Sequence, residues 1–337
     1  MTRRSPLALA AGVALLVVPL LAAPVGATGG ARGQHDRTVA YWTPERIRGA
    51  IPRDFVTSND GRFVPAAKPP GTGGGKPGGG GGSVGGASWT GGGEIVKRSG
   101  RVLFTMGGVD YICSASVASD SKSTYSVILT AAHCAYDESA GAFATNWMYI
   151  PSFDTAPTYS CASATYGCWT ALALVVHSGY ATAGGFNQQA TIHDFAFAVV
   201  GVGGNGNTQL DALGAYPVTT ALATGNTLYA FGYPAAGKYK GKDLTYCKGP
   251  IFQDPYNANL TWGMTCDMTG GSSGGPWLAG TTNPANGSGS LGSLNSYGYS
   301  GVNAMHGPKF NNDTTAVYNA AKNANPDAVG IDGIIVP

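Results

Sequence analysis

The sequence predicts an all-β domain, an antiparallel sandwich or barrel, over the part of the chain that follows residue 93. From residue 101 onward, short runs rich in β-branched and aromatic residues alternate with turn residues such as Gly107 and Gly108. Apolar residues recur at helical spacing in one place there, residues 314–324, where a helix is expected. A parallel α/β fold would need a crossover helix between successive strands, so the scarcity of helices argues against it.

The expected strands are short apolar runs that end at turn residues. The first, residues 102–106, ends at Gly107. In the fourth, large and small apolar residues alternate around Ala198, and an acidic residue directly precedes the run. In chain order these strands cover residues 102–106, 125–130, 172–177, 195–202, 227–231 and 260–266.

Glycine and charge divide the chain into unlike parts. Of its 53 glycines, 14 lie in residues 71–93, a stretch expected to be a flexible linker because it offers no side chains to bury. Residues 1–88 carry 10 Lys/Arg and 4 Asp/Glu, whereas residues 89–337 carry 10 and 14. The larger part therefore offers no broad basic face, and nucleic-acid binding is not expected.

The amino terminus has the pattern of an export signal over residues 1–27. Arg3 and Arg4 precede an apolar run, and Val25 and Ala27 fit the small-residue positions of a cleavage site. A membrane anchor is the alternative, but the apolar run is short for a bilayer core. We expect a secreted, extracellular protein that has no membrane association after signal removal.

Residues 28–70 are basic and contain one helix signal, in which Thr43 can cap a helix that has Pro44 at its first position. We expect these residues to be a pro-segment of the domain at residues 94–337. Such a segment would inhibit that domain or assist its folding, and a cut within or just after the glycine-rich stretch would release it. A disordered secreted tail is the alternative.

Six cysteines follow the glycine-rich stretch, and their even number in an exported protein indicates three disulfides. Sequence alone leaves many pairings open. Closure of the shortest loops favours pairing each cysteine with the next one along the chain: Cys113 with Cys134, Cys161 with Cys168, and Cys247 with Cys266. Paired metal-ligand spacings are missing from the sequence, so no metal site is expected.

Three short motifs carry the residue types of nucleophilic catalysis. Residues 130–134 read TAAHC at the end of an apolar strand, Asp194 opens an alternating strand, and residues 271–276 read GSSGGP. They supply His133, Asp194 and Ser273 in that order. A serine hydroxyl becomes a useful nucleophile when an imidazole takes its proton, and a buried carboxylate fixes the tautomer of that imidazole.

On these motifs the chain resembles the chymotrypsin/trypsin-like serine proteases. The resemblance implies two antiparallel six-stranded β-barrels, near residues 95–205 and 206–313, with a C-terminal helix and the active site between them. It also implies an endopeptidase that forms an acyl-enzyme on Ser273 and stabilises the oxyanion with the N–H groups of Gly271 and Ser273. Such an enzyme would be a monomer that acts on proteins or peptides and needs no cofactor.

Two other functions remain open for the same scaffold. A protease-like binding protein would have lost activity, although all three side chains are present in this chain. An esterase would share the site and differ only in its substrate. The motif G-x-S-x-G around Ser273 also fits the nucleophile turn of α/β-hydrolases, but that fold needs an acid and a histidine after the serine, and only His306 follows.

The chain departs from trypsin next to the nucleophile. Ser272 stands where the resembling zymogens carry an Asp that pairs with a newly freed amino terminus, so activation by that salt bridge is in doubt. Residues 269–274, Thr-Gly-Gly-Ser-Ser-Gly, are similar to the glutamyl-endopeptidase branch.

Substrate preference is expected to depend on two further places. Asp267 lies six residues before Ser273, the register of the specificity carboxylate of trypsin, which implies cleavage after Lys or Arg. Alternatively, Asp267 hydrogen-bonds a local turn. The sequence Ser296-Tyr297-Gly298 resembles the family strand that lines the primary pocket and pairs with the substrate backbone.

The other acidic residues and histidines receive no catalytic role. Asp154 or Asp211 could replace Asp194, but neither heads an alternating strand between the two other motifs. His193 should point away from its neighbour Asp194 and lie at the surface. The remaining histidines without motif context are His35, His177 and His306.

Overall fold

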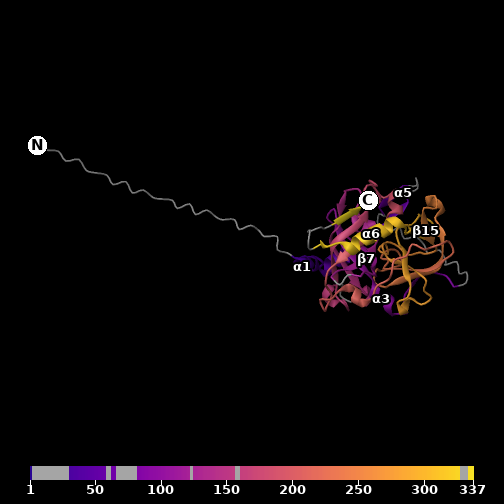
Figure 1. Ribbon diagram of the computed structural model, residues 1–337, viewed down its shortest axis with the longest axis horizontal. Helices are drawn as coiled ribbons and strands as arrows, with labels where there is room; N and C mark the ends of the chain where they lie inside the picture. Colours follow the sequence, from indigo (N-terminus) through magenta and orange to yellow (C-terminus); the bar gives the residue numbers. More distant parts are fainter. Residues whose placement is uncertain (2–29, 58–61, 66–81, 122–123, 156–159, 327–332) are drawn as a thin grey trace.

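The computed structural model describes residue 1 and residues 30–57, 62–65, 82–121, 124–155, 160–326 and 333–337. The expected export signal, residues 1–27, lies outside the described residues apart from Met1, and so do residues 71–81 of the expected linker. The body of the molecule is built from two β-structures, and Figure 1 shows the C-terminal helix α6 in yellow across the part that contains β7. The predicted all-β architecture with a C-terminal helix is confirmed.

The first β-structure is a closed six-stranded barrel. Its strands follow the order β6-β5-β10-β11-β12-β7, and β6 also pairs with β7, which closes the ring. These strands are β5 (Ser99–Met106), β6 (Val109–Ala118), β7 (Ser126–Thr130), β10 (Thr145–Pro151), β11 (Trp169–His177) and β12 (Ala196–Val200). Small additions beside it are β8 (Tyr136–Asp137), β9 (Ala142–Phe143), α4 (Ser178–Ala181) and α5 (Gln188–Ile192).

The hairpin between β5 and β6 shows how local sequence sets the register of this barrel. Met106 pairs with Val109, so Gly107 and Gly108 form a two-residue turn, with φ of 55° and 80°. Such turns need positive φ at both central positions, which glycine adopts without steric cost. The expected strand and its glycine turn are thus confirmed.

The second β-structure is a curled half-barrel in the order β17-β16-β13-β14-β15-β18. It has the six strands expected from the resemblance, but the described residues include no β17–β18 ladder that would close it. The free edge of β17 is used by the connection between the two halves, because Leu291 exchanges backbone hydrogen bonds of 2.8 Å with Pro217 and Thr219. The strands are β13 (Thr227–Gly232), β14 (Thr245–Gln253), β15 (Thr261–Met264), β16 (Pro276–Ala279), β17 (Ser290–Leu294) and β18 (Met305–Pro308).

The helix expected at residues 314–324 is α6 (Asn312–Asn323). It begins with a capping box, in which the Asn311 side chain accepts from the Thr314 N–H and the Thr314 hydroxyl accepts in return. The helix packs on β11 and β12, and β19 (Gly333–Val336) adds to β11 in parallel. None of the described helices, α6 included, has the length and apolarity needed to span a bilayer.

The basic N-terminal region is folded onto the first barrel. Thr43 caps a helix that starts with Pro44, as predicted, and its hydroxyl accepts from the Arg46 N–H. Trp42 is buried, and its indole N–H donates to the Asn146 carbonyl at 2.6 Å. A disordered tail is therefore wrong for the described part of this region. Its elements are α1 (Ala31–Tyr41), α2 (Pro44–Gly49), β1 (Ile51–Pro52), β2 (Phe55–Thr57) and β3 (Phe63–Pro65).

The end of the expected linker is a strand of the second sheet. Residues 84–88 form β4 (Val84–Ser88), which pairs with β14, and Trp89 packs edge-on against Phe231 and Tyr246. The short helix α3 (Glu94–Arg98) then leads into β5. Gly85 and Gly86 lie where the register with β14 shifts, and the Gly85 carbonyl accepts from the Asp267 N–H at 2.8 Å.

The three disulfides join the cysteines that short-loop closure favoured: Cys113 with Cys134, Cys161 with Cys168, and Cys247 with Cys266. The first bond ties β6 to the short helix that carries His133, and the third ties β14 to the residues after β15. Both therefore brace elements that flank the site described next.

Candidate active site

His133 and Asp194 form a buried hydrogen-bonded pair in the first barrel. His133 lies in a 3₁₀ turn directly after β7, and Asp194 lies two residues before β12. The carboxylate accepts from the His133 ring Nδ1 at 2.8 Å and from the His133 backbone N–H at 2.9 Å. Both side chains are fully buried. Because Nδ1 donates to Asp194, the other ring nitrogen, Nε2, carries the free lone pair.

Ser296 adds a third hydrogen bond to this carboxylate. Its hydroxyl donates to Asp194 Oδ2 at 2.5 Å, from the segment that follows β17 in the second sheet. The Asp194 side chain is thereby held from both halves of the molecule. The carboxylate that pairs with His133 is thus Asp194, the one chosen from the sequence over Asp154 and Asp211.

The turn that carries Ser273 connects the second sheet to this pair. Gly271 and Gly274 have φ of 91° and 81°, a region that favours glycine, and they flank two serines. The Gly270 carbonyl accepts from the Ala235 N–H at 2.6 Å, so the Gly271 N–H on the other side of that peptide faces the opposite way. Ser273 is buried, with 4% of its surface exposed.

The carbonyl of Gly271 is held from β5 and β6. The Ser114 hydroxyl donates to it at 2.8 Å, and the Arg101 guanidinium approaches it at 3.4 Å. Arg101 is almost completely buried, and its other amino group donates to the Gly241 carbonyl. Burial lowers the pKa of Arg101 to about 9, which still leaves the guanidinium charged at neutral pH.

The hydrogen bonds of Ser272 help to hold this turn, at the position where trypsin-like zymogens carry an aspartate. Its hydroxyl donates to the Thr269 carbonyl at 2.7 Å, and its own carbonyl accepts from the Asn295 side chain at 3.0 Å. The turn is thus fixed by side chains of the same domain, Arg101 and Ser114 among them. These hydrogen bonds hold the turn where the resembling zymogens would use an aspartate and a new amino terminus.

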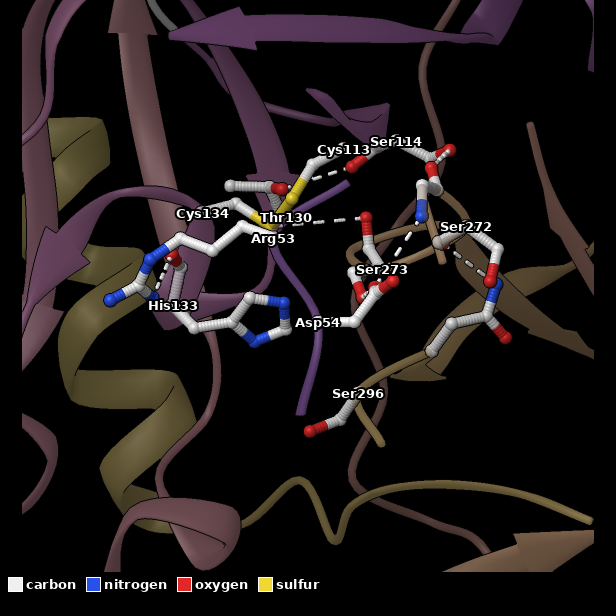
Figure 2. Close-up of a disulfide and its surroundings, with 12 residues drawn as sticks. Arg53, Asp54, Cys113, Ser114, Thr130, His133, Cys134, Ser272, Ser273 and Ser296 are labelled. Atoms are coloured by element: carbon white, nitrogen blue, oxygen red, sulfur yellow. Dashed lines mark hydrogen bonds between the residues drawn. A yellow bond between two sulfur atoms is a disulfide. The ribbon is translucent and has the colours of Figure 1, made fainter. Parts of the chain in front are cut away.

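An unexpected carboxyl group lies against the nucleophile. The Ser273 hydroxyl donates to Asp54 Oδ1 at 3.1 Å, and the Gly271 N–H donates to the same oxygen at 3.4 Å. Figure 2 shows Asp54 reaching Ser273 beside the His133 ring. In the described part of the molecule, His133 Nε2 is buried and has no hydrogen-bond partner. Sequence analysis missed Asp54, because nothing in residues 28–70 marks it as a site residue.

The segment at residues 296–298, expected to line the primary pocket, lies next to this site. Ser296 contacts Asp194 as described above, and Tyr297 is buried. Gly298 forms a parallel backbone bridge with Val56 of the N-terminal region. Of these three residues, Ser296 contacts the pair of His133 and Asp194, and Gly298 contacts the N-terminal region.

Asp267 lies apart from this group and is already paired. Its carboxylate accepts from the Lys238 ammonium at 2.6 Å and from the Tyr239 hydroxyl, and its backbone N–H donates to the Gly85 carbonyl. About a quarter of the Asp267 side chain is exposed. These contacts fit the alternative in which Asp267 is engaged in local hydrogen bonds.

We predict that Asp267→Asn will change kcat/KM for Lys- and Arg-containing peptides by less than about fivefold, because a partly exposed ion pair contributes little. Matched peptides with Arg, Glu or Leu before the scissile bond provide the measurement. A loss of about 100-fold confined to the Arg peptide would instead place Asp267 in the specificity pocket.

His193 is buried, so the expectation that it lies at the surface is wrong. Its ring stacks on His177 with centroids 4.5 Å apart, and its Nε2 lies 3.3 Å from an Asp313 carboxylate oxygen. The alternation argument fails because β12 begins only at Ala196, and His193 instead ends helix α5.

Two groups of described residues bring potential metal ligands within 4.8 Å of one another. In the group of Cys113, His133 and Cys134, the two sulfurs are joined in a disulfide and cannot act as thiolates. The other group is His177, His193 and Asp313. His177 Nδ1 already accepts from a backbone N–H, so its hydrogen bonding is explained without an ion.

His306, the one histidine after Ser273, does not meet the nucleophile. It is fully buried, its Nε2 lies 3.7 Å from Asp254, and its ring stacks on Tyr297. Burial lowers the pKa of His306. The α/β-hydrolase alternative needs this histidine beside Ser273, and its contacts in the described structure are elsewhere.

Three of the solved structures similar to this chain are proteases. The protease Anisep from Arthrobacter nicotinovorans is 37% identical, with a TM-score of 0.60, over 71% of this chain and 100% of that one. The thermostable serine protease AL20 from an extremophilic microorganism is 33% identical, with a TM-score of 0.59, over 69% of this chain and 100% of that one. A Glu endopeptidase shares the fold at 20% identity, with a TM-score of 0.52, over 72% of this chain and 99% of that one. No family model and no curated protein matches the sequence.

Proposed function

The chain belongs to the chymotrypsin/trypsin-like serine proteases, and from this premise we propose that it is the precursor of a secreted serine endopeptidase. The observation that carries the proposal is the buried pair of His133 and Asp194, whose 2.8 Å hydrogen bond leaves Nε2 as the base, next to the glycine turn of Ser273. The endopeptidase would need no metal or organic cofactor, because these groups supply the nucleophile, the base and the oxyanion donors.

In the first half of the proposed reaction, Ser273 is acylated. Its Oγ adds to the carbonyl carbon of the scissile peptide bond while His133 Nε2 takes the hydroxyl proton. Asp194 stabilises the imidazolium that forms, through the hydrogen bond to Nδ1. The tetrahedral oxyanion accepts from the N–H groups of Gly271 and Ser273. The imidazolium then gives its proton to the leaving amine, and the C–N bond breaks.

In the second half, water hydrolyses the acyl-enzyme. His133 takes a proton from the water as its oxygen adds to the ester carbonyl, and the same two N–H groups stabilise the second oxyanion. Collapse breaks the bond to Ser273 Oγ, which regains its proton from His133. The released product is a peptide with a new carboxyl terminus.

Secretion is supported by two independent features. The amino-terminal pattern of residues 1–27 is typical of an export signal, and all six cysteines are paired in disulfides, as is usual in oxidising compartments. Mass spectrometry of the culture medium tests this proposal, because the exported protein should lack residues 1–27.

Active-site labelling and peptide digestion together test the function. The protein from the medium is treated with a fluorophosphonate probe, and the labelled residue is located by mass spectrometry. We expect the label on Ser273 and cleavage of a mixed peptide library by the unlabelled protein. Labelling without peptide cleavage, but with hydrolysis of simple esters, would favour the esterase. A fully matured form that is not labelled would favour the inactive binding protein.

A further inference from the structure

Residues 51–57 of the N-terminal region run through the site and contact both halves of the molecule. At one end, β1 pairs in parallel with β6, Ile51 opposite Tyr111. At the other end, Val56 forms its bridge with Gly298. The segment therefore lies across the pair of His133 and Asp194 and the turn of Ser273, and Asp54 stands in its middle.

The side chains on each side of Asp54 are anchored. The Arg53 guanidinium donates to the His133 carbonyl at 2.6 Å and lies 3.3 Å from the buried carboxylate of Glu138. Phe55 stacks face to face on Phe186, with centroids 4.0 Å apart and planes 2° from parallel. Phe55 also meets the His133 ring edge-on at 5.6 Å. These contacts fix the backbone on both sides of the carboxyl group.

Gly270 leaves the space that the Asp54 carboxyl group occupies. A Cβ atom at position 270 would lie 1.5 Å from Asp54 Oδ2 and 2.9 Å from Pro52 Cβ. The nearest atoms to that position thus all belong to the N-terminal segment. The turn and the segment are complementary in shape, because any side chain at position 270 would displace the carboxyl group.

The hydrogen bonds of Asp54 replace those that catalysis needs. Oδ1 takes the hydrogen bond of the Ser273 hydroxyl, while His133 Nε2 has no partner in the described structure. The same oxygen takes the Gly271 N–H, the donor that an oxyanion would use. One carboxyl group therefore separates the nucleophile from its base and fills the oxyanion site.

We propose that residues 51–57 are a tethered inhibitor of this enzyme, in which the Asp54 carboxyl group blocks the oxyanion site and takes the Ser273 hydrogen bond away from His133. The inference rests on the proposed function and specifies the ligand: an extended peptide with an acidic side chain between an arginine and an aromatic residue. The Asp54 side-chain carboxyl group contains no amide bond, so this group cannot be hydrolysed by Ser273 as a peptide bond would be.

Precursor labelling tests this proposal. The full chain is treated with the fluorophosphonate probe, and label is counted only at the mass of the uncut precursor. In Asp54→Ala, the rate of Ser273 labelling should rise about 10- to 100-fold, the effect of losing hydrogen bonds to a buried group. The matched control is Glu45→Gln, which removes an acidic residue of the same region that is exposed and paired with Arg48. Its labelling rate should equal that of the parent.

Gly270→Ala gives a second route to the same result, because its methyl group excludes the carboxyl group while Asp54 remains. Faster precursor labelling in both variants supports the proposal, and a parental rate in a folded Asp54→Ala precursor overturns it.

Amide hydrogen exchange of residues 51–57 adds a readout that is independent of activity. If no form of the protein is labelled, the proposed function has failed, and exchange then decides whether Asp54 holds the segment. Faster exchange in Asp54→Ala than in Glu45→Gln supports docking by Asp54, and equal exchange overturns it.

The pH dependence of the precursor follows from the surroundings of Asp54. Burial raises the pKa of Asp54, although His133, Ser273, Gly271 and Arg101 each oppose that shift. A carboxyl group whose pKa rises on docking binds a proton more readily in the docked state. Binding of residues 51–57 to the site is therefore strongest below the pKa that the Asp54 carboxyl group has when the segment is undocked. It weakens as pH rises through the higher pKa of the docked state.

We expect the labelling rate of the precursor, divided by that of the matured enzyme, to increase as pH rises above about 4, the ordinary pKa of an aspartate carboxyl group. The division removes effects of pH on the probe that are common to both forms. In Asp54→Asn this ratio should be independent of pH. A ratio in the parent that is flat or falls with pH would contradict the weakening of docking with rising pH that the raised pKa of Asp54 implies.

Discussion

Ser273→Ala should lower kcat of the matured enzyme by about 10⁶ while leaving the fold intact. The expected loss is large because alanine removes the atom that forms the acyl-enzyme, and His133 and Asp194 then have no nucleophile to activate. The residual rate would come from the oxyanion donors and from substrate binding. Steady-state hydrolysis of a chromogenic peptide gives kcat, and circular dichroism checks the fold.

The matched control is Ser139→Ala, at an exposed position of the loop after β8. Its kcat should equal that of the parent. The precursor must be matured by an added protease in each case, because Ser273→Ala would be unable to process itself. Turnover by Ser273→Ala within tenfold of the parent would remove Ser273 as the nucleophile.

Asp194→Asn should lower kcat by about 10⁴. In the parent, the Asp194 carboxylate accepts hydrogen bonds from Nδ1 and the backbone N–H of His133 and from the Ser296 hydroxyl. An amide in its place can present its NH₂ group to the ring, which favours the tautomer with the proton on Nε2. That tautomer cannot take the Ser273 proton. Peptide hydrolysis from neutral to alkaline pH gives the size of the loss.

Asp211→Asn is the control, since Asp211 is one of the two alternative carboxylates and its backbone N–H donates to Ser126 at the start of β7, the strand whose other end leads to His133. It should leave kcat within about twofold, as expected for a surface substitution. A loss of only tenfold in Asp194→Asn, or a larger loss in Asp211→Asn, would mean that the orienting carboxylate has been assigned to the wrong residue.

Much of the fold was predictable because its signals are local. The turn at Gly107 and Gly108 needs residues that tolerate positive φ, and the α6 cap needs the side chain of Asn311, so short stretches of sequence suffice. The open edge of β17 was not predictable. It depends on a backbone pairing between Leu291 and the connection near Pro217, which no local pattern encodes.

The residues of the candidate site also fall into two groups, those that a local motif predicts and those that it does not. His133 and Ser273 lie in motifs whose residues are adjacent in sequence, and Asp194 precedes a recognisable strand. Asp54 contacts a residue 219 positions away, and Arg101 reaches a carbonyl 170 positions away. Neither has a neighbouring pattern that marks it. Tertiary packing alone brings an acidic side chain to the N–H of Gly271 and a buried cation to its carbonyl.

The attachment of the inhibitory segment to the enzyme makes its inhibition independent of dilution until the chain is cut. While residues 51–57 and the barrel are one chain, the segment binds its own cleft as an intramolecular ligand, and its occupancy does not depend on protein concentration. One cut between β3 and β4 would leave β4 paired with β14 and turn the segment into a separate ligand. Its occupancy would then fall with dilution. Molecules crowded near the cell would remain inhibited after the cut, whereas molecules that diffuse away would become active.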